Sequence, residues 1–195
     1  MSRDDALRSI AMIAAKMDAV VFVGNGYNAR ALCALADSPR HFYMMGSMGA
    51  CPTLAAGFAL QAPMPVIAIE GDGNALMSLS GFPVVAYAAP RTFAHIVLDN
   101  GVFETTGCHR TLSPNVDFAA LATATGYRSV YSVADEVSLV SALNGALEAT
   151  GASFIHVRTG IVAGGDTHPR VPYHPREISQ RFRDATSLQP SRTGG

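Results

Sequence analysis

The chain has 195 residues, a formal net charge of −1, and 49% hydrophobic against 15% charged residues. The near-neutral charge argues against nucleic acid or an anionic membrane surface as a partner. The length suits one domain with a sizeable core, and the small share of charged residues predicts an apolar surface covered by a partner chain. Three widely spaced cysteines match no disulfide or metal pattern and "MSRDDALRSI" is no signal peptide, so a reducing cytoplasm is expected.

Short apolar runs alternate with segments of helical periodicity along the whole chain. Residues 42–69 carry no charge, but their prolines and glycines would break a membrane-spanning helix. The expected strands are 19–23, 42–44, 65–70, 94–100, 129–133 and 153–159. The expected helices are one capped by Ser2, then 28–37, 53–60, one opened by 71–74, 117–124, one around 137–147, and 176–185.

Nearly continuous apolar strands that alternate with helices predict an α/β fold. The sheet should be doubly wound and mostly parallel, with helices on both faces. We expect a single domain over 1–165, followed by a C-terminal tail over 166–195 with a short helix and a frayed end at 191–195. Ligands of such sheets bind in the loops at the carboxyl ends of the strands.

The first glycine-rich turn, in "VVFVGNGYNARAL", lies between an expected strand and an expected helix. Its G-x-G-x-x-A spacing is that of a dinucleotide fingerprint, which also needs an acidic residue about 20 positions later. Asp37 comes too early for that role and Glu70 too late. Three interpretations stay open: a nicotinamide or flavin site, a plain strand–helix turn, or another phosphate-contacting loop that includes Asn25 and Gly26.

The second glycine-rich turn, "EGDGN", also joins an expected strand to an expected helix. Gly71 and Gly73 allow a tight turn and close approach of a ligand, and Asp72 is a hard oxygen donor suited to Mg²⁺ beside phosphate. Asn100 ends the next expected strand and supplies a second hard oxygen. Adjacent parallel strands would bring Asp72 and Asn100 together, which predicts a magnesium site.

Three segments resemble the thiamine diphosphate-dependent decarboxylase family: "FYMMGSMGA", "EGDGNALM" and "HIVLDNGVFETTG". The likeness covers residues 20–160. It is greatest to the diphosphate-binding domain of the phosphonopyruvate and sulfopyruvate decarboxylases. Asp99-Asn100 replaces the Asn-Asn pair that is usual in the wider family.

The resemblance implies roles around the two turns. Asp72 and Asn100 would bind Mg²⁺ together with the carbonyl of Val102. Gly73 and Asn74 would hold the diphosphate of thiamine diphosphate. Residues Asn25, Gly26 and Gly71 would contribute to the same cofactor site.

The "GSMG" segment would contact the organic part of the cofactor. The resemblance implies that Met48 supports the bent shape of the cofactor and that the Gly46 carbonyl accepts a hydrogen bond from its aminopyrimidine, with Ser47 between them. On the residues alone, Met48 is interpreted simply as a core methionine.

Four further side chains keep two interpretations each. Glu104 either takes part in proton transfer or caps its loop. His109, with Arg110, either binds an anionic group of the substrate or lies at a solvated loop tip. His95 and His156 alternate with apolar residues in strands, so we expect core histidines there rather than ligands.

In the family that the chain resembles, the cofactor bridges two domains, and this chain has the length of one. The resemblance therefore implies a partner, the alpha or pyrimidine-domain subunit, in a heterodimer or heterotetramer. The implied function is the diphosphate- and magnesium-binding subunit of a lyase that decarboxylates sulfopyruvate, phosphonopyruvate or a similar 2-oxo acid to an aldehyde and CO₂. The alternatives are a carboligase subunit of acyloin or acetolactate type, and a non-catalytic regulatory subunit.

Overall fold

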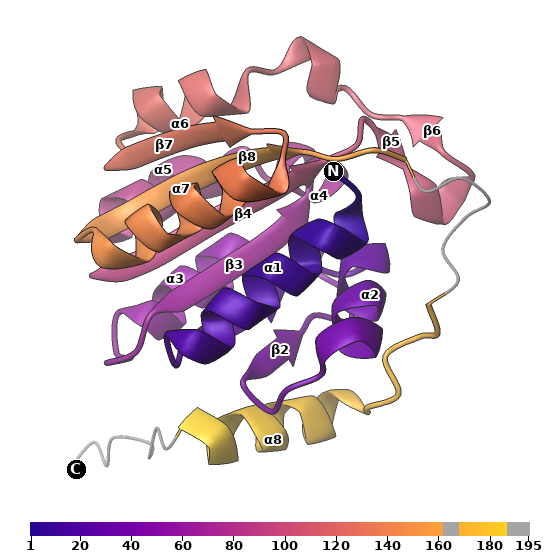
Figure 1. The fold of residues 1–195 in the computed structure, drawn as a ribbon, viewed down its shortest axis with the longest axis vertical. Coiled ribbons are helices and arrows are strands. Elements are labelled where there is room, and N and C mark those ends of the chain that lie inside the picture. Colours follow the sequence, from indigo (N-terminus) through magenta and orange to yellow (C-terminus); the bar gives the residue numbers. More distant parts are fainter. Residues whose placement is uncertain (162–167, 187–195) are drawn as a thin grey trace.

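The structure, a computed structural model, describes residues 1–161 and 168–186. Six parallel strands form one sheet in the order β2-β1-β3-β4-β8-β7, and a small antiparallel hairpin pairs β5 with β6 (Figure 1). The strands are β1 (Val20–Val23), β2 (His41–Tyr43), β3 (Val66–Gly71), β4 (Thr92–Asp99), β5 (Val102–Phe103), β6 (His109–Arg110), β7 (Ser129–Val133) and β8 (Gly151–Arg158).

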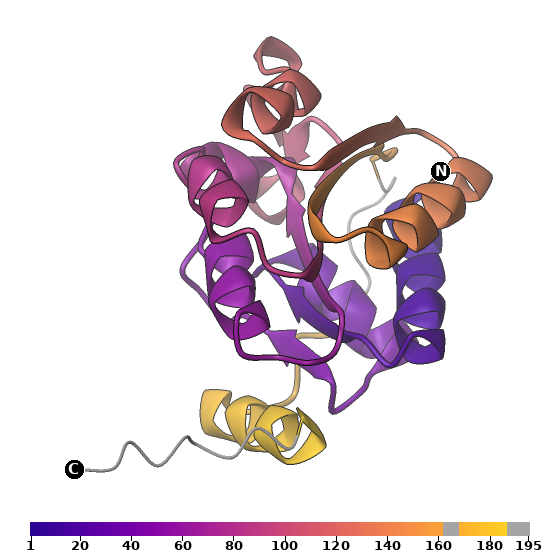
Figure 2. The ribbon, with the colours of Figure 1, turned by 90° about the vertical axis from the view of Figure 1, so that its left-hand side faces the viewer.

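Helices cover both faces of the sheet, as the sequence predicts. α1, α2 and α7 pack on one face, and α3, α5 and α6 pack on the other. Figure 2 shows the two helical layers on opposite sides of the strands. The helices are α1 (Arg3–Lys16), α2 (Tyr27–Ala36), α3 (Cys51–Ala59), α4 (Asp72–Met77), α5 (Gly81–Ala88), α6 (Phe118–Thr125), α7 (Glu136–Glu148) and α8 (Pro175–Thr186).

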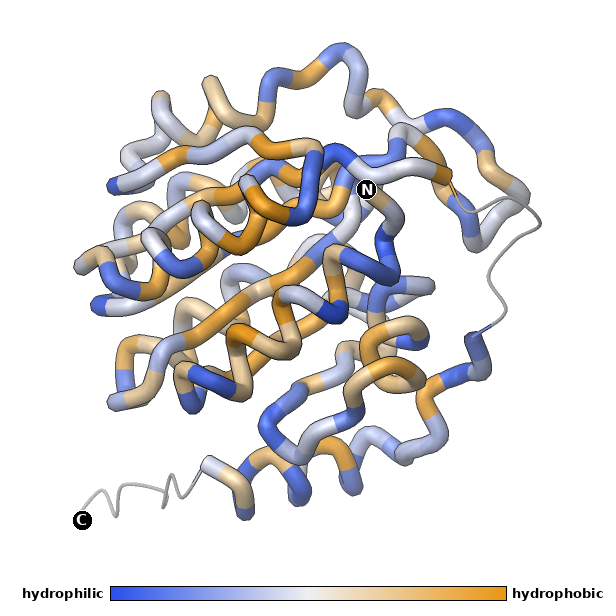
Figure 3. Tube along the Cα trace, in the orientation of Figure 1, coloured by the Kyte–Doolittle hydropathy of each residue, from blue (hydrophilic) through white to orange (hydrophobic). Residues whose placement is uncertain are grey.

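The strands form where apolar residues run without interruption. Every residue of β1 is buried, and so are all but the last of β3 and all but the first of β4. The tube in Figure 3 is correspondingly hydrophobic along the middle strands and hydrophilic at many loops. Two buried faces require such continuous apolar runs, and the α/β prediction is confirmed.

Side-chain caps begin three of the helices. The Ser2 hydroxyl accepts a hydrogen bond from the backbone N–H of Asp5, as the sequence predicts. Asp117 and Asp135 cap α6 and α7 in the same way. Each cap satisfies a backbone donor that the first helical turn leaves without a partner.

Two parts of the fold were not expected from the sequence. α5 is a separate helix whose sequence, "GFPVVAYA", is apolar on all sides and so has no helical periodicity. Residues 101–116, expected as a loop, contain the β5–β6 hairpin and two 3₁₀ turns, at Glu104–Thr106 and Ser113–Asn115. Both hairpin strands are only two residues long, which is too short for an alternating pattern.

The C-terminal helix α8 closes the β2 edge of the sheet. Phe182 packs against the rings of Phe22, Phe42 and Phe58. The predicted short helix is confirmed, and the expected frayed end at 191–195 lies outside the described residues. In the described ranges no helix is long and apolar enough to cross a membrane.

A buried histidine on β2 is expected to make stability depend on pH. Burial lowers the pKa of His41 to about 4; the charge of Asp37 raises it, and that of Arg181 lowers it. The unfolded chain therefore binds a proton at His41 below pH 6.5, whereas the native chain does so only near pH 4. Stability from this residue is present above pH 6.5 and is lost as the pH falls toward 4.

We expect the free energy of unfolding to fall by about 2 kcal/mol between pH 7 and pH 5 because of His41 alone. His41→Gln should remove that part of the pH dependence in urea unfolding measured at both pH values. His174→Gln, at an exposed histidine, is the control and should leave the pH dependence of stability unchanged. A His41→Gln chain with the full pH dependence would contradict the assignment.

Candidate functional site

The candidate site lies at the point where the strand order of the sheet changes direction. β1 leads outward to β2, whereas β3, on its other side, leads to β4. Ligands of open α/β sheets bind at the carboxyl ends of strands at such a switch point. A pocket of about 110 Å³ lies there. It is lined by Arg3, Asn25, Gly26, Tyr27, Asn28, Met48, Gly71, Asp72, Gly73, Leu98, Asn100, Val102, Phe103, Glu104, Thr105 and Thr159.

Asp72 begins α4 directly after β3, and its side chain is buried, at 3% exposure. One carboxylate oxygen accepts a hydrogen bond from the Thr111 hydroxyl. Burial raises the pKa of Asp72, the Thr111 bond lowers it, and the charge of Asp99 raises it, so that the net shift is upward. The ionised carboxylate is therefore short of positive charge, a condition that a bound cation would relieve.

Asn100 directly follows β4, the strand next to β3, and Val102 begins β5. The Asn100 side-chain oxygen accepts a hydrogen bond from the Val102 N–H, which shapes the turn into β5. Phe103 then packs so closely on the backbone of Gly73 that a Cβ there would lie 2.2 Å from the ring. Only glycine allows this approach, which holds β5 against the start of α4.

Asp99 serves another purpose than its neighbour Asn100. Its carboxylate contacts His156 Nε2 at 2.8 Å, Ser113 Oγ at 2.6 Å and the Gly101 N–H at 3.1 Å. Burial raises the pKa of Asp99, but the hydrogen bonds of His156 and Ser113 outweigh it and the net shift is downward. Asp99 therefore fixes the loop that carries Asn100.

The first glycine-rich turn contacts the second. Asn74 Nδ2 donates a hydrogen bond to Asn25 Oδ1 at 3.2 Å. A Cβ on Gly24 would lie 2.6 Å from the same Asn74 amide, so this glycine makes room for Asn74. Asn25 and Gly26 line the pocket, and Gly26 precedes α2 without a side-chain cap.

Of the "GSMG" segment, Met48 lines the candidate pocket and is half-buried. Gly46 and Ser47 are exposed and line a different hollow, against α8. Partial exposure into the pocket is not what a plain core methionine would show. The roles of Gly46 and Ser47 toward a cofactor remain predictions.

The two candidate catalytic side chains lie apart. Glu104 lines the pocket and accepts a hydrogen bond from the guanidinium of Arg3. His109 is exposed on β6, where its Nδ1 contacts Thr106 Oγ1 at 3.2 Å, and it does not line the pocket. A catalytic role of His109 therefore stays a prediction.

The sequence did not indicate three contacts that support the site. Thr111 reaches Asp72, and Arg3 reaches Glu104 across 101 positions of the chain. Glu70 pairs with His95, which is fully buried as predicted. His156 is buried too, at 7% exposure. The alternation of strand residues was the available signal for Glu70 and His95, but it does not give the register between two strands.

A larger cavity, of about 860 Å³, lies beside the candidate pocket at the ends of β4, β7 and β8. The two share Asn100 and Thr159, and the larger one has Asp99 and His156 in its lining. We assign the function to the smaller pocket, because only there do both candidate cation ligands and both glycine-rich turns converge.

The donor set of the small pocket fits a hard divalent cation. Asp72 offers a carboxylate, Asn100 an amide oxygen, and Val102 a backbone carbonyl, which are ligand types that Mg²⁺ accepts. Within the described part of the chain no three His, Cys, Asp or Glu side chains gather as a metal cluster. A cation here would therefore depend on this mixed set and on oxygens of a ligand.

Comparison with known proteins bears on the family. The profile described as thiamine pyrophosphate enzyme, C-terminal TPP binding domain, matches residues 23–157. A phosphonopyruvate decarboxylase from Streptomyces hygroscopicus is 42% identical over 180 residues, which make up 91% of this chain and 44% of that protein. The chain thus spans less than half the length of this relative.

In two other comparisons, the matched region covers most of this chain and most of the other protein. A sulfopyruvate decarboxylase subunit beta from Methanothermobacter thermautotrophicus is 34% identical over 165 residues, 85% of each chain. A 2-oxoglutarate:ferredoxin oxidoreductase from Magnetococcus marinus shares the fold, with a TM-score of 0.69 at 12% identity over 98% of this chain and 87% of that one. From the matched profile and the 34% identity across most of the beta subunit, the chain belongs to the thiamine pyrophosphate enzymes, as a C-terminal TPP-binding domain.

Proposed function

We propose that this chain is the diphosphate- and magnesium-binding subunit of a thiamine diphosphate-dependent 2-oxo acid decarboxylase. The observation that carries the proposal is the convergence of Asp72 and Asn100 at the carboxyl ends of adjacent strands, in a pocket bordered by both glycine-rich turns. Asp72 or Asn100 by itself would indicate no more than an ordinary turn after a strand.

Each part of the pocket has a task in this proposal. Asp72, Asn100 and the Val102 carbonyl would hold Mg²⁺. Gly73 and Asn74, with Asn25 and Gly26 at the start of α2, would hold the diphosphate, because the free N–H groups at the start of a helix favour phosphate. Gly71 gives the ligand access to the backbone, and Met48 supports the organic part of the cofactor.

Thiamine diphosphate, when bound, supplies the carbanion and the electron sink that release CO₂ from a 2-oxo acid. This chain orients the cofactor through its anchored diphosphate, so that binding energy far from the reaction positions the reacting end. Glu104 at the pocket wall is the candidate for moving a proton. The names of the relatives support a phosphonated or sulfonated pyruvate as the substrate class.

The proposal includes a partner that carries the pyrimidine domain. The relative covered over most of its length is a subunit beta, and the chain matches only 44% of the longer Streptomyces relative. Large apolar side chains are exposed on several helices, among them Tyr87 on α5 at 94% and Met77 on α4 at 65%. Apolar surface of this kind is typical of a protein–protein interface.

Calorimetric titration of thiamine diphosphate tests the proposal. The chain is titrated alone and with the presumed partner, first with Mg²⁺ and then with chelator. We expect tight binding only with partner and Mg²⁺, and decarboxylation of sulfopyruvate or phosphonopyruvate only by the complex. If thiamine diphosphate binds under none of these conditions, the proposed function is wrong. If the single chain decarboxylates the substrate at a normal enzymatic rate, the proposed need for a partner chain is wrong.

A further inference from the structure

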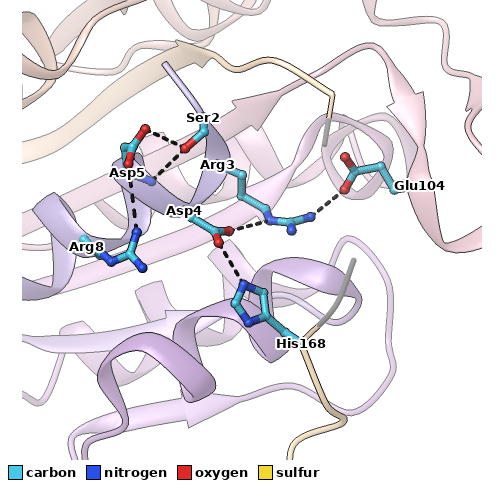
Figure 4. A network of polar contacts seen from close by, with 7 residues as sticks. All are labelled: Ser2, Arg3, Asp4, Asp5, Arg8, Glu104 and His168. Atoms are coloured by element: carbon cyan, nitrogen blue, oxygen red, sulfur yellow. Dashed lines mark hydrogen bonds and ion pairs between the residues drawn. The ribbon is translucent and has the colours of Figure 1, made fainter. Parts of the chain in front are cut away.

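A buried arginine lines the candidate pocket and has no role so far. Arg3, in the first turn of α1, is 3% exposed. In the described ranges, it is the only cationic side chain among the residues that line the pocket, beside the carboxylates of Asp72 and Glu104. Figure 4 shows its guanidinium reaching from α1 to Glu104.

Both its position at the start of a helix and its burial disfavour the positive charge of Arg3. The start of a helix carries partial positive charge, which disfavours arginine there, and a buried charge costs free energy unless it is paired. Among the described residues, three segments nevertheless hold the guanidinium of Arg3. Its Nη1 donates to Glu104 Oε2, its Nε lies 3.5 Å from Asp4 Oδ1, and its Cζ lies 5.7 Å from the centroid of the Tyr27 ring.

The supporting carboxylate of Asp4 is itself fixed. Its other oxygen contacts His168 Nε2 at 2.8 Å, so that the start of α1 is tied to the chain segment before α8. Arg3 is therefore pre-oriented, and its Glu104 contact shows where the pocket can hold an oxygen anion. Guanidinium binds carboxylate, phosphate and sulfonate-like groups through the same planar donor geometry.

We propose that Arg3 is the oxyanion-binding residue of this pocket, and that the Glu104 carboxylate occupies the anion's place until a ligand oxyanion replaces it. The inference rests on the proposed function, since the oxyanion would be either the cofactor diphosphate or the acidic group of the substrate. Displacement from Arg3 would also release Glu104, the side chain proposed to move a proton.

Four variants of the full chain, with its partner present, test the inference. They are Arg3→Gln, Glu104→Gln, the double variant Arg3→Gln/Glu104→Gln, and the control Arg8→Gln, whose side chain is 57% exposed on the same helix. One readout is calorimetric titration of inorganic pyrophosphate with Mg²⁺. The other is KM and kcat for sulfopyruvate in the cofactor-loaded complex.

We expect Arg3→Gln to weaken the binding of one oxyanion by about tenfold or more. This is the scale of a lost charge-assisted hydrogen bond. Weaker pyrophosphate binding identifies the cofactor, whereas unchanged pyrophosphate binding with a raised KM and a nearly constant kcat identifies the substrate. Glu104→Gln should leave oxyanion binding equal or several-fold tighter, because it removes the competing carboxylate. Arg8→Gln should change neither readout.

The double variant separates binding from folding. It removes the charge that Arg3→Gln alone would leave buried at Glu104, so it should recover thermal stability and still lack oxyanion binding. The inference is overturned if the double variant recovers binding, if Arg3→Gln changes neither readout, or if Glu104→Gln weakens binding as strongly as Arg3→Gln does. If the unmodified complex binds neither thiamine diphosphate nor pyrophosphate, the proposed function fails and this inference with it.

Discussion

Replacing Asp72 by alanine is expected to abolish magnesium-dependent binding of thiamine diphosphate, with a loss of about 100-fold or more in affinity. Changes to residues that merely support a metal ligand already cost about 10- to 100-fold. Asp72 is the only carboxylate in the candidate donor set, so its removal takes away the charge that the cation needs. Calorimetric titration of the complex with partner, with and without chelator, measures the effect.

Removing the charge of Asp72 should not unfold the chain. Burial, together with the charge of Asp99, raises the pKa of Asp72, so the ionised carboxylate costs folding free energy when no cation is present. Asp72→Asn keeps the shape and an oxygen that the Thr111 hydroxyl can reach. We expect its free energy of unfolding without Mg²⁺ to equal or exceed that of the unmodified chain.

Asp135→Asn is the matched control for Asp72. Asp135 caps α7 on the surface, and asparagine caps a helix about as well as aspartate. This variant should retain both stability and cofactor affinity. If Asp72→Ala binds the cofactor with Mg²⁺ as well as the unmodified chain does, Asp72 is no metal ligand and the functional proposal loses its main support.

Replacing Glu70 by alanine is expected to lower the free energy of unfolding by about 2–3 kcal/mol, the scale for leaving a buried polar group without its hydrogen-bond partner. Glu70 is 1% exposed, and its Oε1 contacts Nε2 of the fully buried His95 at 2.9 Å. His95 Nδ1 in turn contacts the Tyr127 hydroxyl at 2.8 Å. The substitution would leave Nε2 of His95 in the core without this partner.

Urea unfolding of three variants measures this effect. Glu70→Gln keeps an oxygen for His95 and should cost much less than Glu70→Ala. Glu148→Ala, at an exposed carboxylate of α7, should change stability by less than about 0.5 kcal/mol. A Glu70→Ala chain as stable as the Glu148→Ala control would show that the buried pair contributes no net stability.

The candidate cation ligands were predictable because each follows an apolar strand. β3 runs into Asp72 and β4 into Asn100, and the two strands are one helical crossover apart, so a parallel sheet places them side by side. The sequence of its loop was enough to make Glu104 a candidate site residue, but not to predict its partner Arg3. The ion pair with Arg3 depends on how α1 packs on the face of the sheet, which places the first turn of this helix beside the pocket.

Strand alternation likewise gave half of the Glu70–His95 contact. It places each of these two side chains on one face of its own strand. Only the register, in which Ala68 lies opposite His95, brings the Glu70 carboxylate within hydrogen-bonding distance of the imidazole. A shift by one residue would have put the two side chains on opposite faces.

The sequence by itself determined the class of fold, the six strands of the main sheet and most helices, and the residue types at the carboxyl ends of β3 and β4. These features depend on residues close together in the chain, whose periodicity and turn types local physics decides. Only the tertiary structure decided the Arg3–Glu104 pair, the Glu70–His95–Tyr127 chain and the packing of α8 on β2. These contacts join distant segments, so they follow from strand order, register and helix placement, which no local pattern encodes.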